Sequence, residues 1–190
     1  MEAYHDIYED KIKITQERLV EELNRKLYQQ KIKQGYTEYI FLCIGSDKIT
    51  GDCFGPLVGT KLRKKLEPYN VFNMHIYGDL ANTISYENIE IYQKRIQSYS
   101  GNTCIIVIDA ALSKKENIGN IYVASEKTIL GKGLNKNKIA LGDISIKAVV
   151  GRDLKIPKYN FATLQNVSLH LVMNLADTVA NSIFEVIQYL

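Results

Sequence analysis

The sequence has few cysteines, little net charge and no long apolar run, and each of these excludes a class of protein. Among 190 residues there are three cysteines, Cys43, Cys53 and Cys104. Their odd number and unrelated spacings fit neither a disulfide framework nor a zinc site. The formal net charge is only +3, from 24 basic and 21 acidic residues, which provides no overall field that would favour nucleic acid or an anionic membrane.

Signals for secretion and membrane insertion are also missing. The first 19 residues lack the layout of a secretory signal, and no apolar run approaches the length needed to span a bilayer. We therefore expect a soluble, cytoplasmic protein without a nucleic acid or membrane partner. The hydrophobic content of 46% predicts one well-buried core at this length. We expect residues 1–36 to supply an amphipathic helix that packs on a single domain, residues 37–190.

Apolar runs alternate with helical periodicities along the chain and predict an α/β protein. Apolar runs predict strands at residues 40–44, 71–77, 104–108, 118–124 and 142–150. Apolar residues at helical spacing predict helices at residues 12–33, 52–67, 85–97 and 164–190. A loop is expected at residues 130–137 and a connector at residues 157–160. This order favours a three-layer α/β/α sandwich with a largely parallel mixed sheet.

Two aspartates follow buried strands and are predicted to meet at one edge of the sheet. Asp52 lies in a polar turn between the strand at residues 40–44 and the next helix, and Asp109 directly follows the strand at residues 104–108. In open α/β sheets the pocket lies outside the carboxyl ends of the strands. Two carboxylates that face one pocket can share a proton, so that one acts as base and the other as acid.

Simpler explanations exist for both aspartates. Asp52 can cap the following helix and Asp109 can tether a loop, as aspartates at element ends often do. Cys53, beside Asp52, offers an alternative nucleophile, although nothing in the sequence places a histidine next to it. These alternatives stay open at the level of the sequence.

Four further loop residues are predicted to bind substrate. Asp47 and Asp79 follow strand ends and could bind a substrate amine in the same cleft, although turn chemistry explains them equally well. Gly45 and Gly51 would let the backbone approach a ligand closely.

Several motifs resemble known families. The motifs T-G-D-C-F-G-P-L-V-G (residues 50–59) and V-I-D-A-A-L (residues 107–112) resemble those of the spore germination proteases. The extended motif C-I-G-S-D-K-I-T-G-D-C-F-G-P-L-V-G-T-K-L, with L-G-D-I-S-I and L-Q-N-V-S-L-H-L-V-M-N-L-A, resembles the YyaC family of sporulation proteins more closely. This likeness covers about residues 38–180. A more distant likeness is to the hydrogenase maturation endopeptidases, which implies a phosphorylase/hydrolase-like fold.

The resemblance implies a sporulation-associated peptidase, located in the cytoplasm of a sporulating cell or spore of a spore-forming bacterium. Asp52 and Asp109 then take the two acidic positions, with a protein or peptide substrate and no cofactor. The sequence departs from the germination proteases at Gly51, where they have proline.

Two alternatives follow from the same resemblance. The maturation endopeptidases bind metal through two acidic residues and a histidine, which makes His170 a third ligand for zinc or nickel. A non-catalytic peptide-binding protein of the same fold is the second. Association into a homo-oligomer is open in each case.

Overall fold

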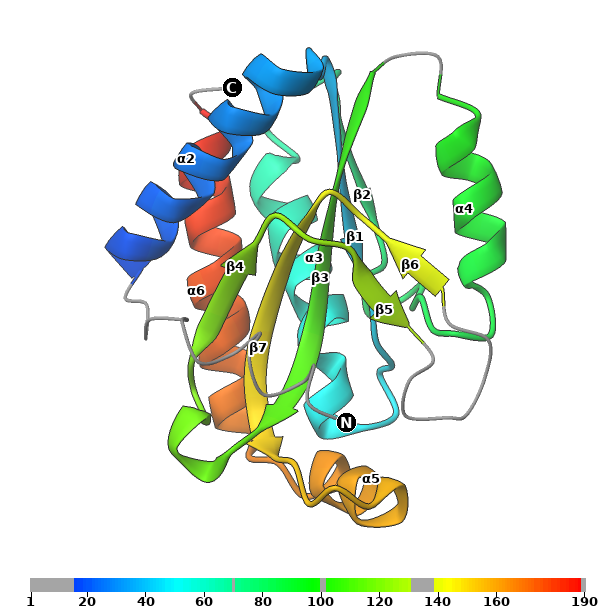
Figure 1. Cartoon of the computed structure of the whole chain (residues 1–190), viewed down its shortest axis with the longest axis vertical. Helices are drawn as coiled ribbons and strands as arrows, with labels where there is room; N and C mark the ends of the chain where they lie inside the picture. The colour runs from blue at the N-terminus through cyan, green and yellow to red at the C-terminus, as the bar shows by residue number, and fades with distance from the viewer. Residues whose placement is uncertain (1–15, 70, 100–101, 131–138, 189–190) are drawn as a thin grey trace.

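A five-stranded sheet forms the centre of the protein, with helices on both faces (Figure 1). The computed structural model describes residues 16–69, 71–99, 102–130 and 139–188. The strands are β1 (Glu38–Cys43), β2 (Met74–Tyr77), β3 (Thr103–Ser113), β4 (Ile121–Ala124), β5 (Thr128–Leu130), β6 (Ile139–Leu141) and β7 (Ile144–Arg152). The helices are α2 (Gln16–Gln34), α3 (Phe54–Leu66), α4 (Ile89–Gln97), α5 (Pro157–Gln165) and α6 (Leu169–Ile187), with the short 3₁₀ helices η1 (Thr50–Cys53) and η2 (Lys115–Asn117).

The strand order in the central sheet is β2-β1-β3-β7-β4. Neighbouring strands are parallel except for β4, which pairs antiparallel with β7. Strands β5 and β6 form a separate antiparallel pair. The arrangement confirms the predicted α/β class with a largely parallel mixed sheet.

Both faces of the sheet are covered, which explains why β1 is apolar along nearly its whole length. Phe41 and Cys43 point into a core shared with α2, α3 and α6. Ile40 and Leu42 point into a second core on the opposite face, which includes Ile89 of α4 and partly buried residues of β6. Figure 1 shows α4 and the β5–β6 pair on the other side of the sheet from α2 and α6.

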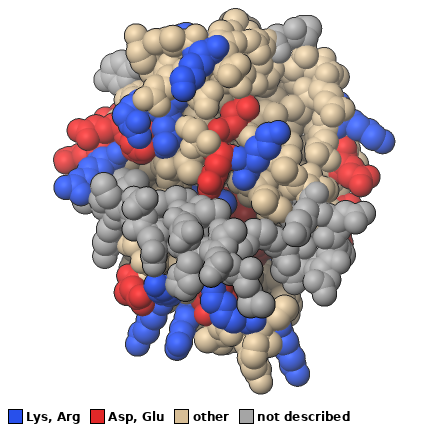
Figure 2. All heavy atoms as spheres, viewed as in Figure 1, with Lys and Arg blue, Asp and Glu red and all other residues tan. Residues whose placement is uncertain are grey.

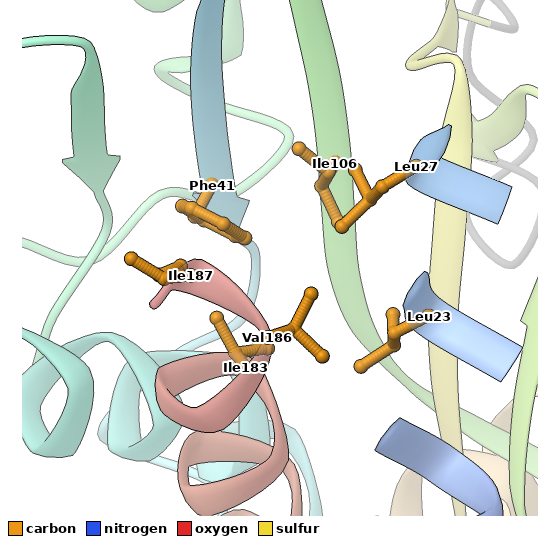
Figure 3. A pocket seen from close by; sticks show the side chains of 7 residues that line it. All are labelled: Leu23, Leu27, Phe41, Ile106, Ile183, Val186 and Ile187. Carbon is orange, nitrogen blue, oxygen red and sulfur yellow. The ribbon is translucent and has the colours of Figure 1, made fainter. Parts of the chain in front are cut away.

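Helix α2 is a structural layer of the domain. Its buried residues Leu19, Leu23 and Leu27 recur every four positions and form one stripe. The helix ends at Gly35, whose φ of +66° suits glycine. Seven apolar side chains from α2, α6, β1 and β3 meet beneath it (Figure 3): Leu23, Leu27, Phe41, Ile106, Ile183, Val186 and Ile187. The predicted amphipathic helix is confirmed from residue 16 onward, and residues 12–15 lie outside the described part.

Among the helices that the structure describes, α6 is the most apolar, and it packs against both α2 and α3. Ser168 begins it as N-cap, because its hydroxyl oxygen accepts a hydrogen bond from the Leu171 N–H at 3.4 Å. Figure 2 shows charged side chains of both signs on this face, with several Lys and Arg at the lower end, where Figure 1 places α5 and the turn between β3 and β4. Within the described ranges, no helix combines the length and apolarity needed to cross a bilayer.

Several element boundaries differ from those predicted. Strand β3 continues to Ser113 instead of ending at Ile108, because residues 106–113 pair with β7 across one register shift. The predicted connector at residues 157–160 is the first turn of α5, which begins at a proline. Strands β5 and β6 were not predicted, and they flank residues 131–138, most of the expected loop, which lie outside the described part.

Candidate functional site

Asp52 lies in η1, in the turn that joins β1 to α3. The Ser46 N–H donates to the Asp52 carbonyl oxygen at 3.2 Å, and the Asp52 N–H donates to the Ile49 carbonyl at 2.9 Å. Gly45 is required for this fold of the turn: its φ is +145°, and a Cβ there would lie 1.9 Å from the Asp52 carbonyl oxygen. The turn thereby folds back on itself and leaves Asp52 half-buried beside the end of β1.

Asp109 lies within β3, at the point where its neighbour β1 has ended. The pairing of β1 with β3 stops at Cys43 and Ile108. Asp109 is therefore the first β3 residue without a β1 partner, and η1 contacts β3 in this region. On its other side Asp109 pairs with Lys147 of β7. The early end of β1 explains how a residue inside a strand can face the turn that carries Asp52.

The two aspartates interact electrostatically. Burial raises the pKa of Asp52 to about 6, against the opposing effect of a backbone hydrogen bond from Ser46. Burial also raises the pKa of Asp109 to about 7. The negative charge of Asp52 adds to that increase, while Lys147 and the backbone N–H of Ala110 act to lower the pKa of Asp109. At about pH 6.5, midway between the two pKa values, the pair consequently holds about one proton, with Asp109 the more protonated member.

Lys147 is a functional candidate that the sequence reasoning missed. Its side chain is 16% exposed, and its Nζ lies 3.9 Å from Oε1 of Glu126. The signal was present in the sequence, because Lys147 is the sole charged residue of β7 before the terminal Arg152. A charged side chain inside an apolar strand requires partners.

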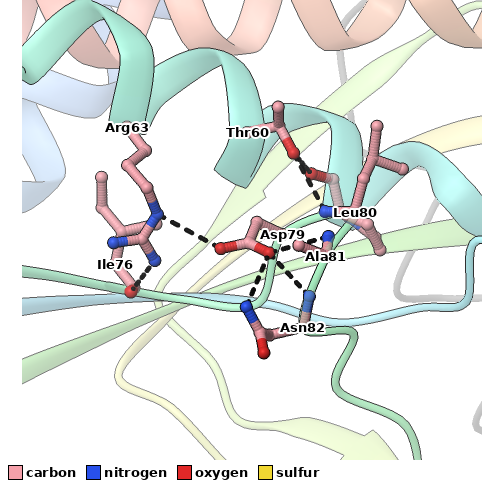
Figure 4. Close-up of polar contacts among 8 residues, drawn as sticks. Thr60, Arg63, Ile76, Asp79, Leu80, Ala81 and Asn82 are labelled. Atoms are coloured by element: carbon pink, nitrogen blue, oxygen red, sulfur yellow. Dashed lines mark hydrogen bonds and ion pairs between the residues drawn. The ribbon is translucent and has the colours of Figure 1, made fainter.

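Asp79 organises its own loop, as Figure 4 shows. Its Oδ1 accepts hydrogen bonds from the N–H groups of Ala81 at 2.9 Å and Asn82 at 2.7 Å. Its Oδ2 lies 3.2 Å from Nε of Arg63, which also donates to the Ile76 carbonyl. Both carboxylate oxygens thus have partners within the protein, so turn chemistry accounts for Asp79, and its predicted contact with substrate gains no support.

The other residues near Asp52 have different surroundings. Asp47 is exposed in the turn after β1, and its role in substrate binding stays a prediction. Gly51 is buried, and a Cβ there would lie 3.0 Å from the Leu164 carbonyl oxygen, so its lack of a side chain lets α5 pack on η1. The Cys53 thiol donates a hydrogen bond to the Thr50 carbonyl oxygen at 2.9 Å, and burial raises the pKa of this thiol. A raised pKa disfavours the thiolate that nucleophilic chemistry requires.

His170 does not complete a metal site with the aspartates. It is exposed in the first turn of α6, and its Nε2 lies 3.1 Å from Nδ2 of Asn174. Among the residues that the structure describes, no three His, Cys, Asp and Glu side chains are grouped closely enough to hold a metal ion. The predicted zinc or nickel site of Asp52, Asp109 and His170 is therefore not formed by this arrangement.

Comparison with known proteins identifies the family. Residues 11–182 match a family described as "Protein of unknown function (DUF1256)". The chain belongs to the DUF1256 family. The matched range includes both aspartates, Lys147 and His170. This family description names no activity.

One sequence relative of this DUF1256 chain and one solved structure of similar fold are informative. The uncharacterized protein YyaC from Bacillus subtilis (strain 168) is 30% identical over 144 residues, which cover 76% of this chain and 67% of that protein. A crystal structure of the [NiFe] hydrogenase maturation protease HycI from Thermococcus kodakarensis KOD1 matches with a TM-score of 0.56 and 18% identity, covering 85% of this chain and 99% of that one. These findings confirm the expected relationship to YyaC and the fold shared with hydrogenase maturation proteases. At 18% identity the second likeness concerns the fold alone.

Proposed function

We propose that this DUF1256 protein is a peptidase that hydrolyses a peptide bond with a water molecule activated by Asp52 and Asp109. The observation that carries the proposal is the placement of Asp52 in η1, beside the end of β1, and of Asp109 at the first β3 position beyond that end, where the charge of Asp52 helps to raise the pKa of Asp109. Their pKa values of about 6 and about 7 match general acid–base chemistry near neutral pH.

The different surroundings of the two carboxyl groups assign their roles. Asp52 has the lower pKa and is the base that takes a proton from water as the water oxygen attacks the carbonyl carbon. Asp109 has the higher pKa, carries the shared proton and donates it to the carbonyl oxygen. In the tetrahedral intermediate Asp52 then passes the proton it took from water to the amide nitrogen, the C–N bond breaks, and one hydroxyl group returns its proton to Asp109, so that a carboxylic acid and an amine leave and both aspartates regain their starting states.

The biological setting of the proposal is a sporulating cell or spore. Its support is the set of motifs that resemble sporulation proteins, together with the relationship to YyaC of Bacillus subtilis. The substrate class is a protein or peptide, because the proposed chemistry is that of peptide hydrolysis and the fold is shared with a maturation protease.

The test is a search for new peptide termini. The purified full-length protein is incubated with a tryptic digest of a bacterial cell extract in H₂¹⁸O, across the pH range from mildly acidic to mildly alkaline. New carboxyl termini should carry ¹⁸O, and their yield should be highest at about pH 6.5, between the two pKa values. Asp52→Asn and Asp109→Asn should each abolish cleavage. Glu116→Gln, at an exposed acid of η2, is the matched control and should cleave as the unmodified protein does.

Two results would overturn the proposal. One is cleavage by Asp52→Asn and Asp109→Asn at the rate of the unmodified protein, which would remove the pair from the chemistry. The other is peptide binding by the unmodified protein without new termini at any pH tested. That outcome would establish the non-catalytic peptide-binding alternative.

A further inference from the structure

A row of polar side chains crosses the sheet beside Asp52. Asp109 of β3 pairs with Lys147 of β7, and Lys147 pairs with Tyr122 of β4. Register partners on neighbouring strands point to the same face of a sheet. Tyr122 is 2% exposed, and its hydroxyl accepts a hydrogen bond from Nδ2 of Asn120 at 3.2 Å. On the same face of the sheet, two residues before Asp109, the apolar Val107 belongs to the second core. The row is therefore a polar interruption of a largely apolar face.

Lys147 is the cationic member of this row and lies between two acids. Asp109 is its neighbour on β3, and Oε1 of Glu126 lies 3.9 Å from its Nζ. That distance exceeds hydrogen-bonding range, so Glu126 attracts the ammonium by charge without fixing it. The side chain of Lys147 is only 16% exposed and that of Glu126 is 33% exposed. Water therefore screens the interactions of Lys147 only in part.

The charges that face Asp109 come from two directions. Asp52 approaches from η1 and favours the protonated form of Asp109, whereas Lys147 approaches from β7 and favours the ionised form. Lys147 is the register partner of Asp109, while its Nζ lies 3.9 Å from Glu126, so both carboxyl groups interact with the same positive charge. Tyr122 on β4 supplies the neutral end of the row.

We propose that Lys147 is a positioning residue of the site, whose ammonium is divided between Asp109 and Glu126 and thereby governs how readily Asp109 releases its proton. The proposal rests on the proposed function for its catalytic meaning, because Asp109 is the acid of that mechanism. Lys147 acts through Asp109 and needs no contact with the substrate.

The experiment is an NMR titration of the Asp109 carboxyl carbon in the full-length protein, labelled with ¹³C at aspartate Cγ. The signal is assigned by its loss in Asp109→Asn. Lys147→Met keeps most of the side-chain length and removes the charge, and it should raise the titration midpoint of Asp109 by about one pH unit. Lys147→Arg keeps the charge and should leave the midpoint within about 0.3 pH unit. Glu126→Gln should lower the midpoint, since it removes a carboxylate that competes with Asp109 for the ammonium.

The opposite shifts in Lys147→Met and Glu126→Gln distinguish this role from a structural one. A midpoint in Lys147→Met that matches the unmodified protein, or shifts of the same sign in both variants, would overturn the proposal. If thermal unfolding shows that Lys147→Met does not fold, Lys147→Gln takes its place and should raise the Asp109 midpoint in the same way. The titration requires no cleavage, so it succeeds or fails independently of the peptidase assay. If the protein cleaves peptides, the alkaline limb of the pH profile of its cleavage rate should move to higher pH in Lys147→Met.

Discussion

Replacing Asp109 with asparagine should stabilise the protein at alkaline pH, because the folded state holds this carboxyl group where ionisation is unfavourable. Burial and the charge of Asp52 raise the pKa of Asp109 from 3.8 to about 7. The folded state therefore binds a proton more tightly than the unfolded state between these two pH values. In that window the free energy of unfolding falls as the pH rises, and the loss is complete above the folded-state pKa. The asparagine amide cannot ionise, so the variant avoids this loss.

The size of the effect follows from the same values. The difference between a pKa of 3.8 and one of about 7 corresponds to at most about 4 kcal/mol, at about 1.36 kcal/mol for each pKa unit. Between about pH 5 and about pH 8 the ionisation of Asp109 lowers the free energy of unfolding of the unmodified protein by about 2–3 kcal/mol. Asp109→Asn should therefore gain stability relative to the unmodified protein by about that amount across this range. Groups that do not interact with Asp109 titrate alike in both proteins and cancel from the comparison, whereas Asp52, whose charge interacts with Asp109, adds a smaller change of its own.

The assay is urea unfolding followed by circular dichroism, with both proteins at about pH 5 and about pH 8. Glu116→Gln serves as the control. Glu116 is exposed to solvent, so its replacement should change the free energy of unfolding little at either pH. A stability difference between Asp109→Asn and the unmodified protein that is equal at both pH values would refute the reasoning. It would mean that the Asp109 carboxyl titrates as it does in the unfolded chain.

Three other substitutions test the surroundings of the site. Asp79→Ala should lower the free energy of unfolding by about 2–4 kcal/mol, measured in urea, because two loop N–H groups and Arg63 lose their acceptor; a change below about 0.5 kcal/mol would contradict the described loop. Gly45→Ala should displace η1 and abolish cleavage, because its Cβ would lie 1.9 Å from the Asp52 carbonyl oxygen; a crystal structure of the variant with η1 unmoved would contradict this packing. His170→Ala should leave both stability and cleavage nearly unchanged, and loss of cleavage in a folded variant would restore the metal hypothesis.

The general architecture was readable from the sequence because the signals that specify it are local. The apolar run at residues 40–44 predicts a strand covered on both faces, and β1 is covered on both faces. Leu19, Leu23 and Leu27 predict the buried stripe of α2 by their spacing. Helix α5 lacked such a signal, because none of its residues is buried and no apolar stripe marks it. Its start at Pro157 was the one available indication.

The sequence marked Asp52 and Asp109 as candidates and predicted that they meet at one edge of the sheet, but it did not reveal the register that places them there. Their neighbouring motifs marked Asp52 and Asp109, but the predicted end of β3 at Ile108 was wrong. What brings the pair together is the end of β1 opposite Ile108, while β3 continues beside β7. Such a relation depends on the register between distant segments, which no local pattern encodes. The same register places Lys147 beside Asp109: its position in an apolar strand signals that it needs partners, but the register alone identifies Asp109 as its neighbour.

The most direct test of a shared site is the titration of the Asp109 carboxyl in Asp52→Asn. If the two groups lie in one pocket, removal of the Asp52 charge should lower the Asp109 midpoint from about 7 by about half a unit to one unit. An Asp109 midpoint that is the same with and without the Asp52 carboxylate would show that the two groups do not interact, and the proposed catalytic pair would not exist.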